Sequence, residues 1–152
     1  MQWNKTDMNG KWISFLYRYL QIFMDEQLKR FGIGSGQFIF LLTLLNSDGV
    51  SQESVATSLG IDKGTTAVAM KKLQEKGYII RKTDRADRRS YRIFVTQKAR
   101  SIQKEFKEVL SSWTDILTKG FTRAEMKQAA DILVRMNDNA GTALREKRES
   151  AK

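Results

Sequence analysis

Residues 51–76, SQESVATSLGIDKGTTAVAMKKLQEK, predict two short helices that are joined at Gly60 and Ile61. Ser51 opens the first helix and Asp62 opens the second. Both side chains can accept hydrogen bonds from the free backbone N–H groups of a first helical turn. Two helices joined by a short turn that contains glycine have the outline of a helix-turn-helix.

The second of these helices has two contrasting faces. One face is a stripe at the i, i+3, i+4, i+7 spacing that can pack on a core, formed by Thr66, Ala69, Met70 and Leu73. The other face carries small or basic groups: Gly64, Thr65, Ala67, Val68, Lys71 and Lys72, with Glu75 at its end. A DNA major groove would accept such a face. A solvated helix with one exposed valine would have the same composition, because exposed valines are common.

Positive charge gathers beside this helix. The chain of 152 residues has a formal net charge of +10, which favours polyanions or acidic surfaces as partners. Between Lys71 and Arg92, nine basic side chains face three acidic ones, a local net charge of +6. Basic composition alone does not choose among DNA, RNA and a membrane surface. However, more than half of the excess positive charge lies in this one short segment beside the candidate recognition helix, which favours a role for the segment in binding a polyanion.

The composition excludes several kinds of chemistry. The sequence contains no cysteine and no histidine, so disulfides, thiol redox sensing, Cys/His metal sites and imidazole or thiolate catalysis are all excluded. No acid, base and nucleophile form a constellation, so we expect no enzyme activity, cofactor or metal. The start of the chain lacks a secretory signal. The most apolar run, residues 12–24, is interrupted by Arg18 and is shorter than the ~20 residues that span a bilayer. We therefore expect a cytoplasmic protein without a membrane partner.

The chain before the helix pair predicts two more helices. The first begins between Asp7 and Gly10 and ends near Arg30, and its apolar residues cover nearly every side. Such a helix must be covered on more than one face, either by a second subunit or as a central core helix. The second runs through residues 38–45, with Ser35 as its N-cap.

The chain after the helix pair predicts a hairpin and two further helices. Residues 78–82 and 91–95 have strand character, and the loop between them, TDRADRRS, is basic. This order of helix pair, strand, basic loop and strand is that of a wing. One helix is then predicted from Thr96, and another from a capping box at residues 122–125, with fraying after Gly141. The predicted fold is mainly α with a small β-hairpin wing: a winged helix-turn-helix with further helices before and after it.

Three stretches resemble the multiple-antibiotic-resistance regulator (MarR) family of winged-helix transcription regulators. They are GSGQFIFLLTLL (34–45), VSQESVATSLGIDKGTTAVAMKKLQEKGYI (50–79) and DRADRRSYRIFVTQKA (84–99). The resemblance runs from about residue 12 to residue 136. It implies a homodimer with the N-terminal helix of residues 1–34 and the C-terminal helices of residues 97–152 in the dimerisation region. Residues 35–96 would form the DNA-binding winged helix-turn-helix.

The resemblance also implies how double-stranded DNA is bound. Family members typically bind a pseudo-palindromic site, with recognition helices in consecutive major grooves and wings in the flanking minor grooves, and half-sites about one turn apart suit a two-fold protein. The implied base contacts are Thr65, Ala67 and Val68, and the implied phosphate contacts are Lys63 and Lys72, with Lys71 on the same face. In the wing, Asp87, Arg88 and Arg89 match the family's Asp-Arg-Arg signature, and Arg85 is a further candidate.

Position 68 departs from the family pattern. Relatives commonly have Arg or Lys there, whereas valine cannot make the two hydrogen bonds to guanine that arginine makes. We therefore expect direct readout to be limited to thymine methyl groups against Ala67 and Val68 and to hydroxyl bonds from Thr65. Much of the specificity would then come from A·T-rich DNA shape and from insertion of the wing.

The resemblance further implies a small aromatic or anionic effector. Phe15, Tyr19, Phe38 and Phe40 could line its pocket, although aromatic residues at helical spacing more often belong to a plain core. The predicted function is a sequence-specific regulator, a dimeric repressor released by such a ligand. The alternative is an architectural DNA-binding protein with little sequence preference.

Overall fold

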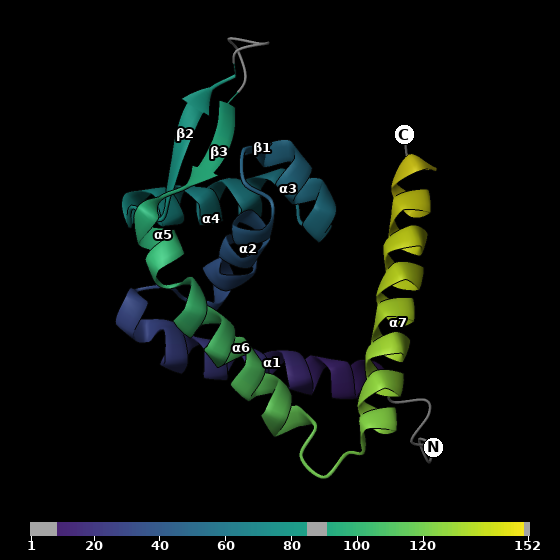
Figure 1. Ribbon diagram of the computed structural model, residues 1–152. Helices are drawn as coiled ribbons and strands as arrows, with labels where there is room; N and C mark the ends of the chain where they lie inside the picture. Colours follow the sequence, from purple (N-terminus) through teal and green to yellow (C-terminus); the bar gives the residue numbers. More distant parts are fainter. Residues whose placement is uncertain (1–8, 85–90, 151–152) are drawn as a thin grey trace. The chain divides into compact units, whose positions relative to one another are not determined.

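The computed structural model describes residues 9–84 and 91–150, and helices form most of this part of the chain (Figure 1). The chain divides into two compact units, one up to Trp113 and one from Thr114 onward. The elements are, in order, α1 (Asn9–Leu28), η2 (Lys29–Phe31), α2 (Ser35–Asn46), β1 (Val50–Ser51), α3 (Gln52–Leu59), α4 (Lys63–Glu75), β2 (Ile79–Thr83), β3 (Tyr91–Val95), α5 (Gln97–Ser101), α6 (Gln103–Leu117) and α7 (Arg123–Glu149).

One small antiparallel sheet lies in the first unit, with the strand order β1-β3-β2. The hairpin pairs Ile79 with Val95 at its base and Thr83 with Tyr91 at its outer end. β1 adds a pair between Val50 and Ile93. The predicted strands of the hairpin and the mainly α fold class are thus confirmed, while β1 was not predicted because two residues are too few to show an alternating pattern.

The core of the first unit collects apolar side chains from most of its elements. Its largest fully buried members are Met24, Leu28, Ile33, Phe40, Leu41, Leu44, Met70, Leu73, Tyr78, Ile79, Ile93 and Phe106. α2 and β3 contribute to this core next to α4. One face of α4 therefore packs on the core, and the opposite face is left to solvent.

α1 buries two apolar side chains of its second half and exposes most of its first half. Met24 and Leu28 belong to the core, whereas Trp12, Leu16 and Tyr19 are exposed. No single helix of the described residues combines the length and apolarity needed to cross a membrane. Only the pair Gly10–Phe31 and Ser35–Asn46, which is bent by 71°, passes that test of length and composition together.

The start of α2 differs from the prediction that Ser35 caps it. Gly34 is the N-cap, and its N–H donates to Gln37 Oε1 at 3.0 Å. Ser35 is the first helical residue, and its N–H and hydroxyl donate to the two carboxylate oxygens of Asp25 at 2.6 and 3.1 Å. The prediction was wrong because the acceptor comes from α1, ten residues earlier, and local cap rules do not include such partners.

The helix predicted from Thr96 is two helices, α5 and α6, which are separated at Ile102. Thr96 is the N-cap of α5, and it also donates its hydroxyl proton to Gly77 O at 2.7 Å. Lys98 Nζ donates to Lys76 O at 2.6 Å. These bonds hold α5 against the end of α4. Apolar periodicity carries no information about such contacts, so it predicted one continuous helix.

The second unit begins in the last turn of α6 and contains α7. The predicted capping box is confirmed: Thr122 N–H donates to Glu125 Oε2 at 2.7 Å, and Glu125 N–H donates to Thr122 Oγ1 at 3.2 Å. Fraying after Gly141 was wrong, because α7 continues to Glu149. The residues beyond Gly141 are mostly charged side chains and alanine, which have high helix propensity and need no apolar stripe.

Candidate nucleic-acid interface

The turn between α3 and α4 is set by Gly60. Its φ of 65° lies in the left-handed region that favours glycine, and its N–H bonds back to the carbonyls of Ala56 and Thr57. Ile61 N–H also donates to Ala56 O, at 3.0 Å. The predicted joint at Gly60 and Ile61 is therefore confirmed, and it ends α3 abruptly enough for α4 to leave in a new direction.

Asp62 caps α4 as predicted. Its Oδ1 accepts from Thr65 N–H at 2.8 Å, and its backbone carbonyl accepts from the Thr66 hydroxyl at 2.9 Å. Hydrogen bonds from the backbone and then the side chain of Thr65 lower the pKa of the Asp62 carboxyl. The cap stays ionised at neutral pH and holds the first turn of α4, which carries Thr65 on its outer side.

The two faces of α4 are as the sequence predicts. The whole stripe of Thr66, Ala69, Met70 and Leu73 is buried. On the opposite face Thr65, Lys71 and Lys72 are exposed, and Val68 is 56% exposed. Ala67 is half-buried on the shoulder. A helix with this face outward presents a methyl-rich surface flanked by lysines.

Lys63 is engaged with α3. Its Nζ lies 2.7 Å from Glu53 Oε1, and both side chains are largely exposed. The hydrogen bond and charge of Glu53 raise the pKa of Lys63, and the same pair lowers the pKa of Glu53. Because exposed ion pairs contribute little to stability, a DNA phosphate can replace Glu53 as the partner of Lys63 at small cost.

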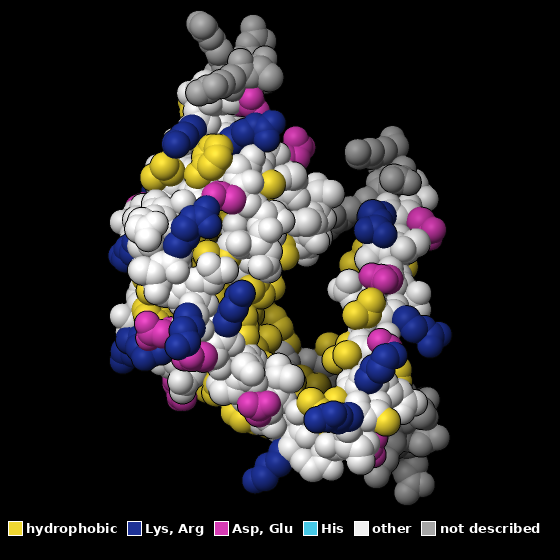
Figure 2. All heavy atoms as spheres, in the orientation of Figure 1, with side chains coloured by type: hydrophobic (Ala, Val, Ile, Leu, Met, Phe, Trp, Pro, Cys, Tyr) yellow, Lys and Arg dark blue, Asp and Glu magenta, His cyan; other side chains and the backbone are white. Residues whose placement is uncertain are grey.

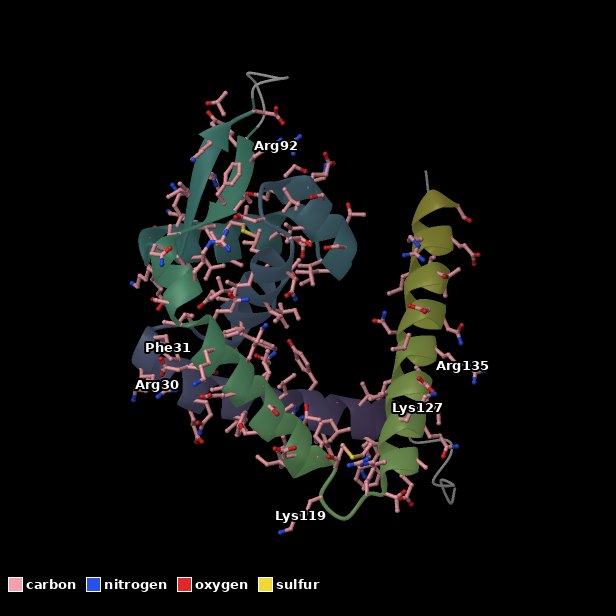
Figure 3. All side chains as sticks on the ribbon, in the orientation of Figure 1. Arg30, Phe31, Arg92, Lys119, Lys127 and Arg135 are labelled. Carbon is pink, nitrogen blue, oxygen red and sulfur yellow. The ribbon has the colours of Figure 1, made fainter. Side chains whose placement is uncertain are left out.

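Arg92 ties the outer end of the hairpin to the rest of the first unit (Figure 3). Its Nε donates to Asp84 Oδ2 at 2.6 Å and its Nη1 donates to Gly49 O at 3.0 Å. Figure 2 shows basic and acidic side chains side by side at this end of the hairpin. Nearer the base, Arg81 Nη2 donates to Gln52 Oε1 on α3 at 3.1 Å. The predicted wing residues Arg85, Asp87, Arg88 and Arg89 lie outside the described residues.

Asp48 joins the hairpin to α5, which the sequence did not predict. Its Oδ1 accepts from the N–H of Val95 at 2.8 Å, and its Oδ2 lies 2.5 Å from Arg100 Nη2. Gly49 follows with a φ of 74°, so the chain can turn sharply into β1. The turn signal at Asp48 and Gly49 was visible in the sequence, but its partners stand 47 and 52 residues away.

The residues that follow α4 are bonded to η2 and to Gly32, which come after α1. Tyr78 Oη donates to Phe31 O at 2.7 Å, and Lys76 Nζ donates to Gly32 O. Burial raises the pKa of Tyr78, so its hydroxyl remains a donor. Through these bonds the orientation of α4 is coupled to the helix expected to lie in the dimerisation region.

The four candidate pocket residues have different environments. Phe38 and Phe40 are buried in the core, whereas Tyr19 is 58% exposed on α1. Phe15 is half-buried, with Lys11 Nζ 5.5 Å and Arg18 Cζ 5.7 Å from its ring centroid. Across residues 9–84 and 91–150, no group of three or more acidic side chains could hold a metal ion.

The helix pair, the sheet and the exposed face of α4 together define a winged helix-turn-helix protein. The sequence model of the MarR family matches residues 31–90. A MarR transcriptional regulator from Methanosarcina mazei Go1 is 44% identical, with a TM-score of 0.82 over 86% of this chain and 94% of that one. The chain belongs to the MarR family of DNA-binding transcriptional regulators.

Two further relatives are more distant. The HTH-type transcriptional regulator YybA of Bacillus subtilis (strain 168) is 25% identical over 127 residues, which cover 84% of this chain and 85% of that protein. A MarR-family transcriptional regulator from Listeria monocytogenes, whose crystal structure is of a complex with a 26mer DNA, is 26% identical. Its TM-score is 0.82, over 94% of this chain and 92% of that one.

Proposed function

We propose that this chain is a sequence-specific dimeric repressor that binds a pseudo-palindromic operator and is released by a small-molecule ligand. The observation that carries the proposal is the outer face of α4, where Thr65 and Val68 stand exposed beside Lys72. The helix that carries them is held by a buried stripe and a side-chain cap. A rigid helix with small and basic groups on its outer face can enter a major groove.

The proposal assigns roles by position. Thr65, Ala67 and Val68 contact base edges. Phosphate and minor-groove contacts come from α4 and the wing: Lys63, Lys71, Lys72, Arg85, Arg88 and Arg89. Asp87 helps to hold a wing arginine in place. Residues 35–96 read the DNA, while residues 1–34 and 97–152 join the subunits.

The exposed apolar side chains of α1 support a dimer. Trp12, Leu16 and Tyr19 are 51%, 44% and 58% exposed, and their i, i+4, i+7 spacing puts them on one helical face. Contiguous exposed apolar groups are typical of protein interfaces. The mass of one chain is 17.5 kDa, and light scattering after size exclusion should give twice that mass. A monomer at micromolar concentration would contradict this part of the proposal.

The effector is assigned to the region of Phe15, Tyr19, Phe38 and Phe40. The two cations beside the Phe15 ring support an anionic or aromatic ligand, since they could pair with a carboxylate while the ring stacks. A ligand bound between α1 and α2 could act on α4 through the bonds that join Tyr78 to Phe31 and Lys76 to Gly32.

One comparison tests sequence specificity. We expect the protein to bind DNA from upstream of its own gene about a thousandfold or more tighter than random DNA at physiological salt. Fluorescence anisotropy with the two duplexes gives the ratio directly. A ratio near one would favour the architectural alternative, which the absence of a long basic side chain at Val68 supports.

A further inference from the structure

A surface hollow lies between the first turn of α2 and the outer face of α4. Its volume is about 450 Å³, and its walls include Gly36 and Gln37 from α2 and Thr65, Val68 and Lys72 from α4. The hollow thus borders the residues to which base contacts are assigned, on the side of α4 that faces α2.

Gln37 brings an unused donor to this hollow. The residue is only 8% exposed, and its Oε1 is occupied by the Gly34 N–H. Its Nε2 has no hydrogen-bond partner in the part of the chain that the structure describes. There, no fully buried side-chain nitrogen or oxygen lacks a partner. The Nε2 atom must therefore be open to solvent, and the hollow that Gln37 lines provides the opening.

The backbone of α2 supplies a second donor. Ser35 N–H bonds to Asp25, and Gln37 and Phe38 N–H both bond to Gly34 O. The N–H of Gly36, between them, has no partner among the described residues. A Cβ atom at Gly36 would meet nothing within 4 Å, so this residue borders open space.

The electrostatics of the hollow suit an anion. Lys72 is the one charged side chain among the described residues that line it. The start of α2 adds the partial positive charge of a helix N-terminus. Two acids lie near the hollow and both already have donors: Asp62 accepts from Thr65 N–H, and Asp25 accepts from the N–H and hydroxyl of Ser35.

We propose that this hollow holds one phosphodiester group of the DNA backbone, with Gly36 N–H and Gln37 Nε2 donating to its oxygens and Lys72 balancing its charge. The assignment rests on the proposed role of α4 as the reading helix. An α-helix with its side chains is about 10–12 Å across and a major groove is about 12 Å wide. If α4 lies in the major groove, the elements beside it lie close to the phosphate groups that border the groove. α2 is such an element.

The test uses substitutions that keep the fold and repel phosphate. In Gln37→Glu a carboxylate oxygen still accepts from Gly34 N–H, and in Gly36→Asp the new side chain meets open space. A negative charge in the first turn of a helix is favourable at an exposed position, whereas Gln37→Glu also buries a charge near Asp25. We therefore expect Gly36→Asp to unfold at a temperature close to that of the parent and Gln37→Glu at a lower one, while both bind the upstream duplex about tenfold more weakly or worse. Weaker binding by Gly36→Asp at unchanged stability would not arise from a damaged fold.

Lys72→Gln and Lys104→Gln form the matched pair for charge. Each removes one lysine from an exposed helical position, but Lys104 pairs with Glu108 on α6, away from the hollow. We expect Lys72→Gln to lower the slope of log affinity against log salt by about one unit and Lys104→Gln to leave it unchanged. The affinity of the parent protein for the upstream duplex and for random DNA tests the proposed function separately from the phosphate site.

Two outcomes would overturn the phosphate assignment. In one, Gln37→Glu and Gly36→Asp bind DNA within twofold of the parent while Lys72→Gln is weakened, so Lys72 meets phosphate elsewhere. In the other, inorganic phosphate shifts the NMR signals of Gly36 N–H and the Gln37 amide while the two variants retain full DNA affinity. The hollow would then be a site for a free anion.

Discussion

The proposed recognition helix, α4, and the hairpin beside it are held in place by different forces. α4 buries four consecutive stripe residues in the core and adds one side-chain cap. Among its described residues, the hairpin buries Ile79 and Val95 at its base and Ile93 at its middle pair. Its outer half depends on polar ties, chiefly from Arg92 to Asp84 and to Gly49 O.

The two kinds of support predict how each element can meet DNA. Apolar burial fixes α4 as a rigid unit, because moving it would expose core side chains to water. The polar ties of the hairpin are partly exposed, with Arg92 half-exposed, and partly exposed polar contacts exchange with water at less cost than core side chains. We expect the outer hairpin to adjust to a groove while α4 keeps its shape, since regions with few buried contacts open first.

The largest effect should come from breaking the apolar support of α4. Leu73 is fully buried, so Leu73→Ala should lower the free energy of unfolding by about 2–5 kcal/mol. Urea denaturation followed by circular dichroism measures this loss. Val68→Ala, on the opposite face of the same helix, is the control and should stay within about 0.5 kcal/mol. Equal losses in both variants would contradict the division of α4 into a supporting and a reading face.

The next effect concerns the bases that the exposed face of α4, which carries Thr65 and Val68, is proposed to recognise. Val68→Arg should create a preference for guanine opposite position 68, worth about 1–3 kcal/mol of discrimination, because arginine can bond to both O6 and N7. The parent should show no such preference and should respond to loss of thymine methyl groups instead. A base-substitution scan of the bound operator, run on both proteins, checks this. Strong guanine dependence in the parent would refute the assigned role of Val68.

The wing should respond through charge. Replacing Arg88 or Arg89 with Ala should weaken binding and lower the salt slope by about one unit for each lost phosphate contact. Affinities measured across a salt series give the slope. An unchanged slope and affinity in both variants would mean that this loop is solvated and that α4 carries the recognition alone.

The features that the sequence predicted are those governed by neighbours along the chain. The Asp62 cap, the buried stripe of α4 and the capping box at Thr122 follow rules that span four to eight residues, and the structure confirms them. The wing arginines and the effector pocket stay predictions.

The features that were missed depend on partners far along the chain. Ser35 is bound by Asp25, and Arg100 is bound by Asp48, 52 residues away. β1 exists only because β3 offers a free edge. The break between α5 and α6 accompanies bonds to the end of α4. Apolar periodicity and helix-cap rules consider only residues close together in the sequence, so they cannot predict these contacts. The tie from Asp84 to Arg92 could have been inferred, because the predicted hairpin places these residues near each other.

A change to the hydrogen bond between Arg92 and Asp84 should give the smallest and most local effect. Arg92→Lys keeps the charge, but a single ammonium group cannot reproduce a guanidinium that donates to Asp84 and Gly49 O from separate nitrogens. The Arg92 side chain is half-exposed, so the loss of stability should be about 1 kcal/mol or less. Hydrogen exchange should quicken at the outer pairs of β2 and β3 and stay unchanged in α4. Arg30→Lys, which changes a more exposed pair with Glu105, should leave the hairpin unaffected. Faster exchange in α4 as well would mean that the two elements share one support.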